Sequence, residues 1–267
     1  MNSPVTLLTD FGTRDGYVAA MKGVIATIAP GAQLIDAGHD IQPGDIAGAA
    51  WALRRYWALF PPGAVHLAVV DPGVGTDRRA IAARVAGRYF VAPDNGLLSW
   101  VLGETDLEAA VSLDRARFRR PEVAPTFHGR DIFAPAAAHL AAGVPLSELG
   151  SPLIHPVRLD LPRAIHRGNE VEGRVVQVDR FGNLITDVPG EWVRGLLEAG
   201  PVRTLVGRAE AGTIRTTYGD ADSGETLALI GSDDTVEVAV RDGRAADKLK
   251  VGLGTPVIVR QASAPQE

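Results

Sequence analysis

The chain contains no cysteine among its 267 residues, which excludes disulfide bonds and thiolate metal sites. It also lacks an excess of basic residues: 27 Lys and Arg against 32 Asp and Glu give a formal net charge of −5, so no nucleic-acid partner is expected. No apolar run can span a bilayer, because Arg54 and Arg55 interrupt the most apolar long window, residues 47–60. The N-terminus has no basic segment typical of a signal peptide. We therefore expect a soluble, cytoplasmic protein with no membrane partner.

Hydrophobic residues make up 46% of the chain, enough for a core in one large domain or two ordinary ones. In the first half, strand-like and helix-like patterns alternate. The expected strands include 5–9, 33–36 and 65–70, and the expected helices include 17–29, 45–60 and 131–142. Residues 81–85 and 89–92 are expected to form a hairpin with Gly87 in its turn. The alternation predicts an α/β N-terminal domain over residues 1–152, with a largely parallel sheet flanked by helices.

The pattern changes after Gly150. Residues 153–169 contain Pro156 and Pro162 and show no sustained period, which is typical of a linker. Residues 170–262 hold short alternating runs separated by Gly, Asp and Ser, with one possible helix at 191–198. This pattern predicts an all-β, antiparallel, barrel-like C-terminal domain.

Two polar clusters carry residues suited to acid–base chemistry. Asp71 ends the apolar run 65–70, and a glycine turn leads from it to Arg78. His128 begins a His-Gly-Arg-Asp run that ends at Asp131, just before an alanine-rich helix. Open α/β sheets build their sites at strand ends of this kind. The structural alternatives are that Asp71 caps its turn and pairs with Arg78, that His128 bonds to nearby backbone, and that Asp131 caps the helix.

Two further clusters carry groups suited to ligand binding. In the segment from Asp10 to Asp15, one carboxylate can bind a sugar diol and the other an ammonium group, or Asp15 can cap the following helix. The segment from Asp179 to Asn183 can stack and hydrogen-bond a flat heterocycle, or it can be an ordinary hairpin turn. Taken alone, each of these two segments favours its structural explanation. His39 can orient a neighbour or simply pack in its loop.

Taken together and in order, six segments resemble the S-adenosylmethionine hydroxide adenosyltransferase family, whose relatives include the fluorinase and chlorinase. They are Thr9-Asp-Phe-Gly12, His39-Asp-Ile-Gln-Pro43, Asp71-Pro-Gly-Val-Gly75, Ala92-Pro-Asp-Asn-Gly96, Thr126-Phe-His-Gly-Arg-Asp131 and Phe181-Gly-Asn183. The resemblance covers nearly the whole chain. It implies an α/β N-terminal domain, a β-barrel-like C-terminal domain, and a homotrimer with its active site between subunits.

The resemblance also implies an activity: hydrolysis of S-adenosyl-L-methionine to adenosine and L-methionine, by in-line attack of activated water on the ribose C5′. The family's water-activating positions match Asp71, Arg78 and His128. Its substrate-binding positions match Asp10 for the ribose; Asp15, Asp179 and Ser232 for the methionine end; and Phe181, Asn183 and Tyr218 for the adenine. S-adenosylmethionine is the substrate, so neither a cofactor nor a metal is expected. Asp233 stands where the fluorinase has an arginine, which leaves the partner of the methionine carboxylate unassigned.

The chemistry leaves some alternatives open. The leaving group is neutral methionine and needs no general acid, so either Asp71 or His128 can take the proton from water. A halide about 4 Å from the Asp71 carboxylate would be repelled by roughly 4 kcal/mol at an effective dielectric of 20, which disfavours a halogenase. A sensor that binds S-adenosylmethionine without cleaving it remains an alternative. So does a metal-dependent hydrolase using Asp10, Asp71, His128 and Asp131, although no short His-rich motif supports it.

Overall fold

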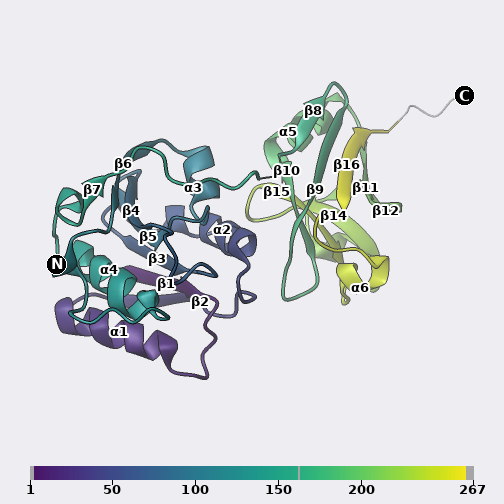
Figure 1. Cartoon of the computed structure of the whole chain (residues 1–267). Helices are drawn as coiled ribbons and strands as arrows, with labels where there is room; N and C mark the ends of the chain where they lie inside the picture. The colour runs from purple at the N-terminus through teal and green to yellow at the C-terminus, as the bar shows by residue number, and fades with distance from the viewer. Residues whose placement is uncertain (1–2, 162, 263–267) are drawn as a thin grey trace, which may run out of the picture. The chain divides into compact units, whose positions relative to one another are not determined.

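A computed structural model of the chain describes residues 3–161 and 163–262, and it divides the chain into two compact units (Figure 1). The first unit is Met1–Leu161 and the second is Pro162–Glu267. The division lies inside the segment 153–169 that the sequence assigns to a linker. Residues 153–161 belong to the first unit, where the backbone N–H groups of Val157 and Leu159 donate to side chains of that unit.

The first unit is built on a seven-stranded sheet. In spatial order its strands are β2 (Leu34–Gly38), β1 (Val5–Thr9), β3 (Val65–Val69), β5 (Arg88–Pro93), β4 (Ala80–Val85), β6 (Leu107–Ser112) and β7 (Ser151–Pro152). The pairs among β2, β1, β3 and β5 are parallel, and the remaining pairs are antiparallel. The sheet is therefore mixed rather than largely parallel.

The reversal begins at the predicted hairpin. The turn between β4 and β5 is Ala86-Gly87, and both residues have positive φ, 45° and 72°. Such a tight turn can join only antiparallel strands. The hairpin therefore makes β4 antiparallel to β5, and the next two pairs, β4 with β6 and β6 with β7, are antiparallel as well.

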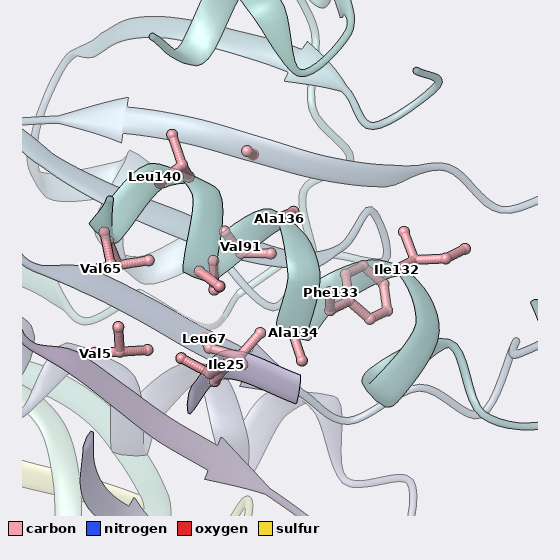
Figure 2. Close-up of a cluster of buried hydrophobic side chains, with 14 of the residues drawn as sticks. Val5, Ile25, Val65, Leu67, Val91, Ile132, Phe133, Ala134, Ala136 and Leu140 are labelled. Carbon is pink, nitrogen blue, oxygen red and sulfur yellow. The ribbon is translucent and has the colours of Figure 1, made fainter. Parts of the chain in front are cut away.

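Helices cover both faces of this sheet. The helices are α1 (Tyr17–Ile28), α2 (Ile46–Arg54), α3 (Ser99–Glu104) and α4 (Ala134–Ala141), with short turns η1 (Trp57–Leu59), η2 (Ala116–Phe118), the π-helical η3 (Gly129–Phe133) and η4 (Leu146–Glu148). One core holds α1 and α4, and Figure 2 shows α4 side chains packed near Val65, Leu67 and Val91. The other core holds α2 and α3. Strands covered on both faces have no solvent-facing side, so β1 and β3 are buried at every residue.

The second unit is a nine-stranded sheet that curls until β12 lies next to β14. Its strands are β8 (Ile165–Arg167), β9 (Glu170–Val178), β10 (Leu184–Pro189), β11 (Val202–Val206), β12 (Ala209–Gly212), β13 (Ile214–Arg215), β14 (Thr226–Ile230), β15 (Thr235–Val240) and β16 (Pro256–Gln261). The barrel-like form agrees with the prediction, but β13 and β14 pair in parallel.

The second unit is also not all-β. It contains α5 (Gly190–Ala199), α6 (Ala245–Leu249) and the 3₁₀ turn η5 (Tyr218–Asp220). Helix α5 buries Val193 and Leu196, whose spacing places them on one helical face, and both join the core of this unit. None of the helices within residues 3–161 and 163–262 has the length and apolar character needed to cross a membrane.

Candidate active site

The first unit brings Asp71, Arg78 and His128 into direct contact. Arg78 Nε donates to Asp71 Oδ1 at 2.7 Å, and Arg78 Nη2 donates to the other carboxylate oxygen. The same Nη2 also donates to His128 Nδ1 at 2.8 Å. The side chains of Asp71 and Arg78 are only 5% and 11% exposed. Asp71 and Arg78 therefore form a bidentate ion pair, as their structural alternative proposed, and this pair also holds the imidazole.

The Arg78–His128 hydrogen bond has a fixed direction. A guanidinium only donates, so Nδ1 of His128 accepts and a neutral imidazole carries its proton on Nε2. Burial, reinforced by the positive charge of Arg78, lowers the pKa of His128 below its ordinary value. At neutral pH His128 is therefore uncharged and presents an N–H donor at Nε2. The carboxylate of Asp71 has about four lone-pair sites, and the guanidinium uses two of them.

A close backbone approach holds the loop 71–79 against the loop that carries His128. Gly75 has φ +79°, and a Cβ at this position would lie 2.7 Å from the carbonyl oxygen of Pro125. Only glycine therefore fits there without displacing backbone. Within the loop, Thr76 Oγ1 donates to the Gly73 carbonyl at 2.7 Å.

Asp131 bonds to residues of the segment 120–130, which contains His128, rather than capping a helix. It lies inside the π-helical turn Gly129–Phe133, and its side chain is wholly buried. Its carboxylate accepts from Arg120 Nη1 at 2.8 Å, Arg130 Nε at 2.7 Å and the Ala124 N–H at 2.9 Å. Burial by itself raises the pKa of Asp131, but the bonds from Arg130, Ala124 and Arg120 lower it to about 2. Asp131 is therefore ionised and ties residues 120–130 together.

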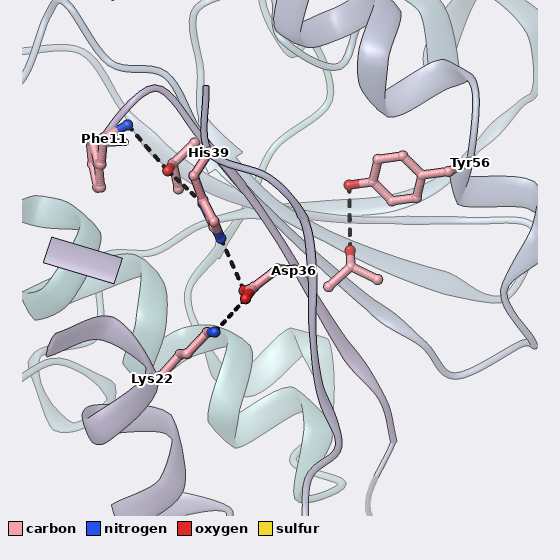
Figure 3. Close-up of polar contacts among 7 residues, drawn as sticks. Phe11, Lys22, Asp36, His39 and Tyr56 are labelled. Atoms are coloured by element: carbon pink, nitrogen blue, oxygen red, sulfur yellow. Dashed lines mark hydrogen bonds and ion pairs between the residues drawn. The ribbon is translucent and has the colours of Figure 1, made fainter. Parts of the chain in front are cut away.

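A chain of hydrogen bonds supports the loop that follows β1 (Figure 3). Thr9 Oγ1 lies 2.9 Å from His39 Nδ1, and His39 Nε2 lies 3.0 Å from Asp36 Oδ1. Lys22 Nζ donates to Asp36 Oδ2 at 2.6 Å, and the Phe11 N–H donates to Thr9 Oγ1 at 3.3 Å. Burial opposes ionisation of Asp36, but the bonds from His39 and Lys22 bring its pKa below the usual value. His39 is thus a buried residue that orients its neighbours.

Asp10 lies between Thr9 and Phe11, which both take part in this network. Its Oδ2 accepts from the Gly44 N–H at 2.8 Å. Because Thr9 pairs with Val69 in parallel strands, Asp10 and Asp71 follow strand ends at the same sheet edge. Asp15 is exposed just before α1, whose N-cap is Gly16. The alternative that Asp15 caps the helix is therefore wrong.

In the second unit, the segment 179–183 forms the turn between β9 and β10. Asp179 Oδ1 accepts from the Asn183 N–H at 2.8 Å, and Asp179 Oδ2 accepts from Asn183 Nδ2 at 3.3 Å. Asn183 is buried, whereas Phe181 is 73% exposed. The structural alternative, a hairpin turn, is what the chain forms, and it presents one aromatic ring to its surroundings.

Tyr218 contacts the strand beside that turn, whereas Ser232 lies away from it. Tyr218 Oη donates to Glu237 Oε1 at 2.6 Å, and Ser232 is exposed in the loop between β14 and β15. Leu184 pairs with Val238 and Pro189 pairs with Thr235. The turn 179–183 and the loop 231–234 therefore lie at opposite ends of the β10–β15 pair.

Sequence reasoning missed Glu237, a carboxylate that is only 7% exposed on β15. Its signal was available, because it is the one charged residue in the otherwise apolar run Thr235–Val240. A buried carboxylate in such a run is unusual and indicates a specific partner. That partner is the Tyr218 hydroxyl.

Two of the four residues of the metal-site alternative are engaged with cations of the protein itself. Asp71 pairs with Arg78, and Asp131 pairs with two arginines. Across residues 3–161 and 163–262, no three His, Asp or Glu side chains are grouped as metal ligands would be.

Comparison with known proteins places this geometry in context. Models of the SAM hydroxide adenosyltransferase N-terminal and C-terminal domains match residues 5–150 and 173–258. An (R)-S-adenosyl-L-methionine hydrolase from Thermus thermophilus is 44% identical over 95% of this chain and 98% of its own length. One from Salinispora arenicola is 43% identical over 94% of this chain and 95% of its own. The crystal structure of an uncharacterized conserved protein from Thermotoga maritima is 37% identical, with a TM-score of 0.91, covering 96% of this chain and 100% of that one.

Proposed function

The chain belongs to the SAM hydroxide adenosyltransferase family, and from this membership we propose that it hydrolyses S-adenosyl-L-methionine to adenosine and L-methionine. The names of the relatives specify the (R) configuration at sulfur, so we propose the (R)-sulfonium epimer as its substrate. The observation that carries the proposal is the contact of Asp71, Arg78 and His128, because this set can orient and deprotonate a water molecule.

The reaction needs a nucleophile more than an acid. Water oxygen attacks the ribose C5′, the C5′–S bond breaks, and its electron pair neutralises the sulfonium as methionine departs. The proton that water loses must go to a base. A positioned base contributes roughly 10²–10⁴-fold to the rate, and alignment of the water with C5′ contributes further.

We assign the base role to Asp71, a choice that the sequence left open. His128 Nδ1 is occupied as an acceptor of the Arg78 bond, so its Nε2–H can only donate. Asp71 keeps unoccupied lone pairs toward which a water can donate. In this assignment His128 holds the water oxygen, Asp71 accepts its proton, and Arg78 fixes both groups while balancing the carboxylate charge.

The same charges argue against halide as the nucleophile. An anion beside the buried Asp71 carboxylate meets like charge in a partly desolvated place, whereas neutral water does not. A protein that only bound S-adenosylmethionine would have no chemical use for a carboxylate and a neutral histidine around one arginine. Hydrolysis uses all three groups.

The remaining site residues are proposed as substrate contacts. Asp10 takes the ribose diol, and Asp15, Asp179 and Ser232 take the methionine end. Phe181, Asn183 and Tyr218 take the adenine, with the exposed ring of Phe181 as the stacking surface. No cofactor is assigned, since S-adenosylmethionine is the substrate. Family membership also supports a homotrimer with the active site between subunits, and we keep the cytoplasmic location as a prediction.

One incubation tests the activity. The purified protein is mixed with the (R) or the (S) epimer of S-adenosylmethionine in H₂¹⁸O, with and without chloride. The products are separated by chromatography and identified by mass spectrometry. We expect equal amounts of adenosine and methionine from the (R) epimer in both buffers, with ¹⁸O in the adenosine. A 5′-chlorinated adenosine would indicate a halogenase. Tight binding without any product would indicate a sensor.

A further inference from the structure

The turn 94–96, which follows β5, contacts both ends of the loop that carries Asp71 and Arg78. Asn95 Nδ2 donates to the Val70 carbonyl at 2.9 Å, directly before Asp71. The Asp94 N–H donates to the Arg79 carbonyl at 2.9 Å, directly after Arg78. The sequence segment Ala92–Gly96 has no role in the reaction as described above. Its contacts nevertheless reach the neighbours of two of the three proposed catalytic residues.

The second of these contacts is reinforced by a buried charge. Asp94 is only 1% exposed in its side chain, and its Oδ2 accepts from Arg79 Nε at 2.7 Å. Its other oxygen, Oδ1, accepts from the Val157 N–H at 2.7 Å. A buried carboxylate held by both Arg79 and the Val157 N–H resists displacement, because losing a partner leaves its charge less well paired in a poorly solvated environment.

The far side of the loop is held by the contact of Gly75 with Pro125, so the loop is fixed at both ends and at its middle. We propose that Asp94 and Asn95 are positioning residues that set the placement of Asp71 and Arg78 relative to His128. Their effect on turnover rests on the proposed function, whereas their effect on the geometry does not. Displacing a catalytic group by about 1 Å can cost 10²-fold in rate, so holding both loop ends matters.

A purely structural role is the competing explanation. The same region also holds residues 155–159, because Ser99 Oγ accepts from the Leu159 N–H at 2.8 Å. Ser99→Ala removes this bond and the bond that Ser99 Oγ donates to the Gly96 carbonyl, but no bond to the loop 71–79, and it serves as the matched control. Asn95→Ala removes the bond to Val70 together with the bond that Asn95 Oδ1 accepts from the Leu97 N–H. Asn95→Asp keeps the side-chain size but turns the donor into an acceptor, and it provides a second variant should the alanine variant fail to fold.

The test has two readouts, one of which needs no substrate. NMR titration follows the His128 ring, assigned from the signal missing in His128→Gln. If Asn95 positions the Asp71–Arg78 ion pair, either Asn95 variant moves this pair from the imidazole, and the pKa of His128 rises toward its ordinary value because Arg78 lowers it. Ser99→Ala leaves this pKa unchanged. With (R)-S-adenosylmethionine, the Asn95 variants lose at least tenfold in kcat with KM within twofold, and Ser99→Ala does not.

Each outcome decides the matter. A folded Asn95 variant with unchanged His128 titration and unchanged kcat overturns the proposal, and so does an equal response in Ser99→Ala. If the wild-type protein fails to cleave S-adenosylmethionine while the His128 titration still responds to Asn95, the proposed function fails and the positioning role stands.

Discussion

The proposed catalytic groups of the first unit and the proposed binding groups of the second are held in different ways. The side chains of Asp71, Arg78 and His128 bond to one another. Their loops are held by the ion pairs of Asp131 and by the close approach of Gly75 to Pro125. In the second unit, the turn 179–183 is held by its own hydrogen bonds and by bonds from Arg244 and the Ala246 N–H to its backbone carbonyls, and it leaves Phe181 exposed.

This difference suggests a division of labour. Groups that move a proton must be placed before the substrate arrives, because reorganising charges during the reaction costs rate. Side chains that contact a ligand's flat face can be solvent-exposed in the free protein, because they become ordered when the ligand binds. We therefore expect substitutions in the first set to lower kcat and substitutions in the second set to raise KM.

The largest effect is expected from Asp71→Asn, which keeps the shape of the side chain and removes its charge and basicity. We expect kcat to fall roughly 10²–10⁴-fold, the value of one positioned base, with KM within a few fold. Steady-state kinetics on (R)-S-adenosylmethionine measures both parameters. A raised KM with unchanged kcat would instead make Asp71 a ligand contact and remove the contrast between the two regions.

Gly75→Ala tests whether the backbone contact with Pro125 holds the two catalytic loops together. The new Cβ would meet the Pro125 carbonyl at 2.7 Å, and the positive φ adds strain of about 1–3 kcal/mol. We expect lower stability in urea unfolding and at least a tenfold loss of kcat. Gly143→Ala is the control, because Gly143 has φ +92° and nothing within 4 Å. It should lose stability and keep kcat; an equal kcat loss in both variants would refute the role of the contact.

Acid unfolding tests the support that Asp131 gives to the His128 segment. The pKa of Asp131 is about 2 in the folded state against 3.8 ordinarily, so the ionised carboxylate favours folding. This stabilisation is complete above pH 3.8 and is lost as the pH falls toward 2; it amounts to about 2 kcal/mol. Asp131→Asn should remove this part of the pH dependence. Asp36→Asn, at a carboxylate that is 48% exposed, should remove less. Parallel acid-unfolding curves for wild type and Asp131→Asn would contradict the assignment.

The smallest effect is expected from Phe181→Ala on the second unit. Stacking of a base on an aromatic ring is worth about 1–3 kcal/mol, so KM should rise about tenfold or more with kcat nearly unchanged. Because Phe181 is 73% exposed, the free energy of unfolding should change by no more than about 0.5 kcal/mol. Leu253→Ala, at another exposed apolar residue of this unit, should change neither quantity. If kcat fell and KM did not, Phe181 would belong with the catalytic groups.

Much of the local structure was readable from the sequence. The strand ends before Asp10 and Asp71 and the turn containing Gly87 were predicted, because apolar runs and glycine positions report on nearby backbone. The family was predicted from its ordered segments. The antiparallel half of the first sheet was missed, because a buried strand has the same apolar pattern whichever way its neighbour runs. The parallel pairing of β13 with β14 was also missed, because a strand of two residues is too short to carry a pattern.

By itself the sequence determined which residue types stand at the strand ends and which segments turn, since these depend on side chains a few positions apart. Only the tertiary structure decided that His128 meets Arg78, 50 residues away, and which atom of each makes the bond. It likewise decided that Asn95 bonds to the Val70 carbonyl and Asp94 to the Arg79 carbonyl, at the two ends of the loop that carries Asp71 and Arg78. The physical reason is that a hydrogen bond has a donor, an acceptor and a direction, and these are fixed only when the chain brings its distant segments together.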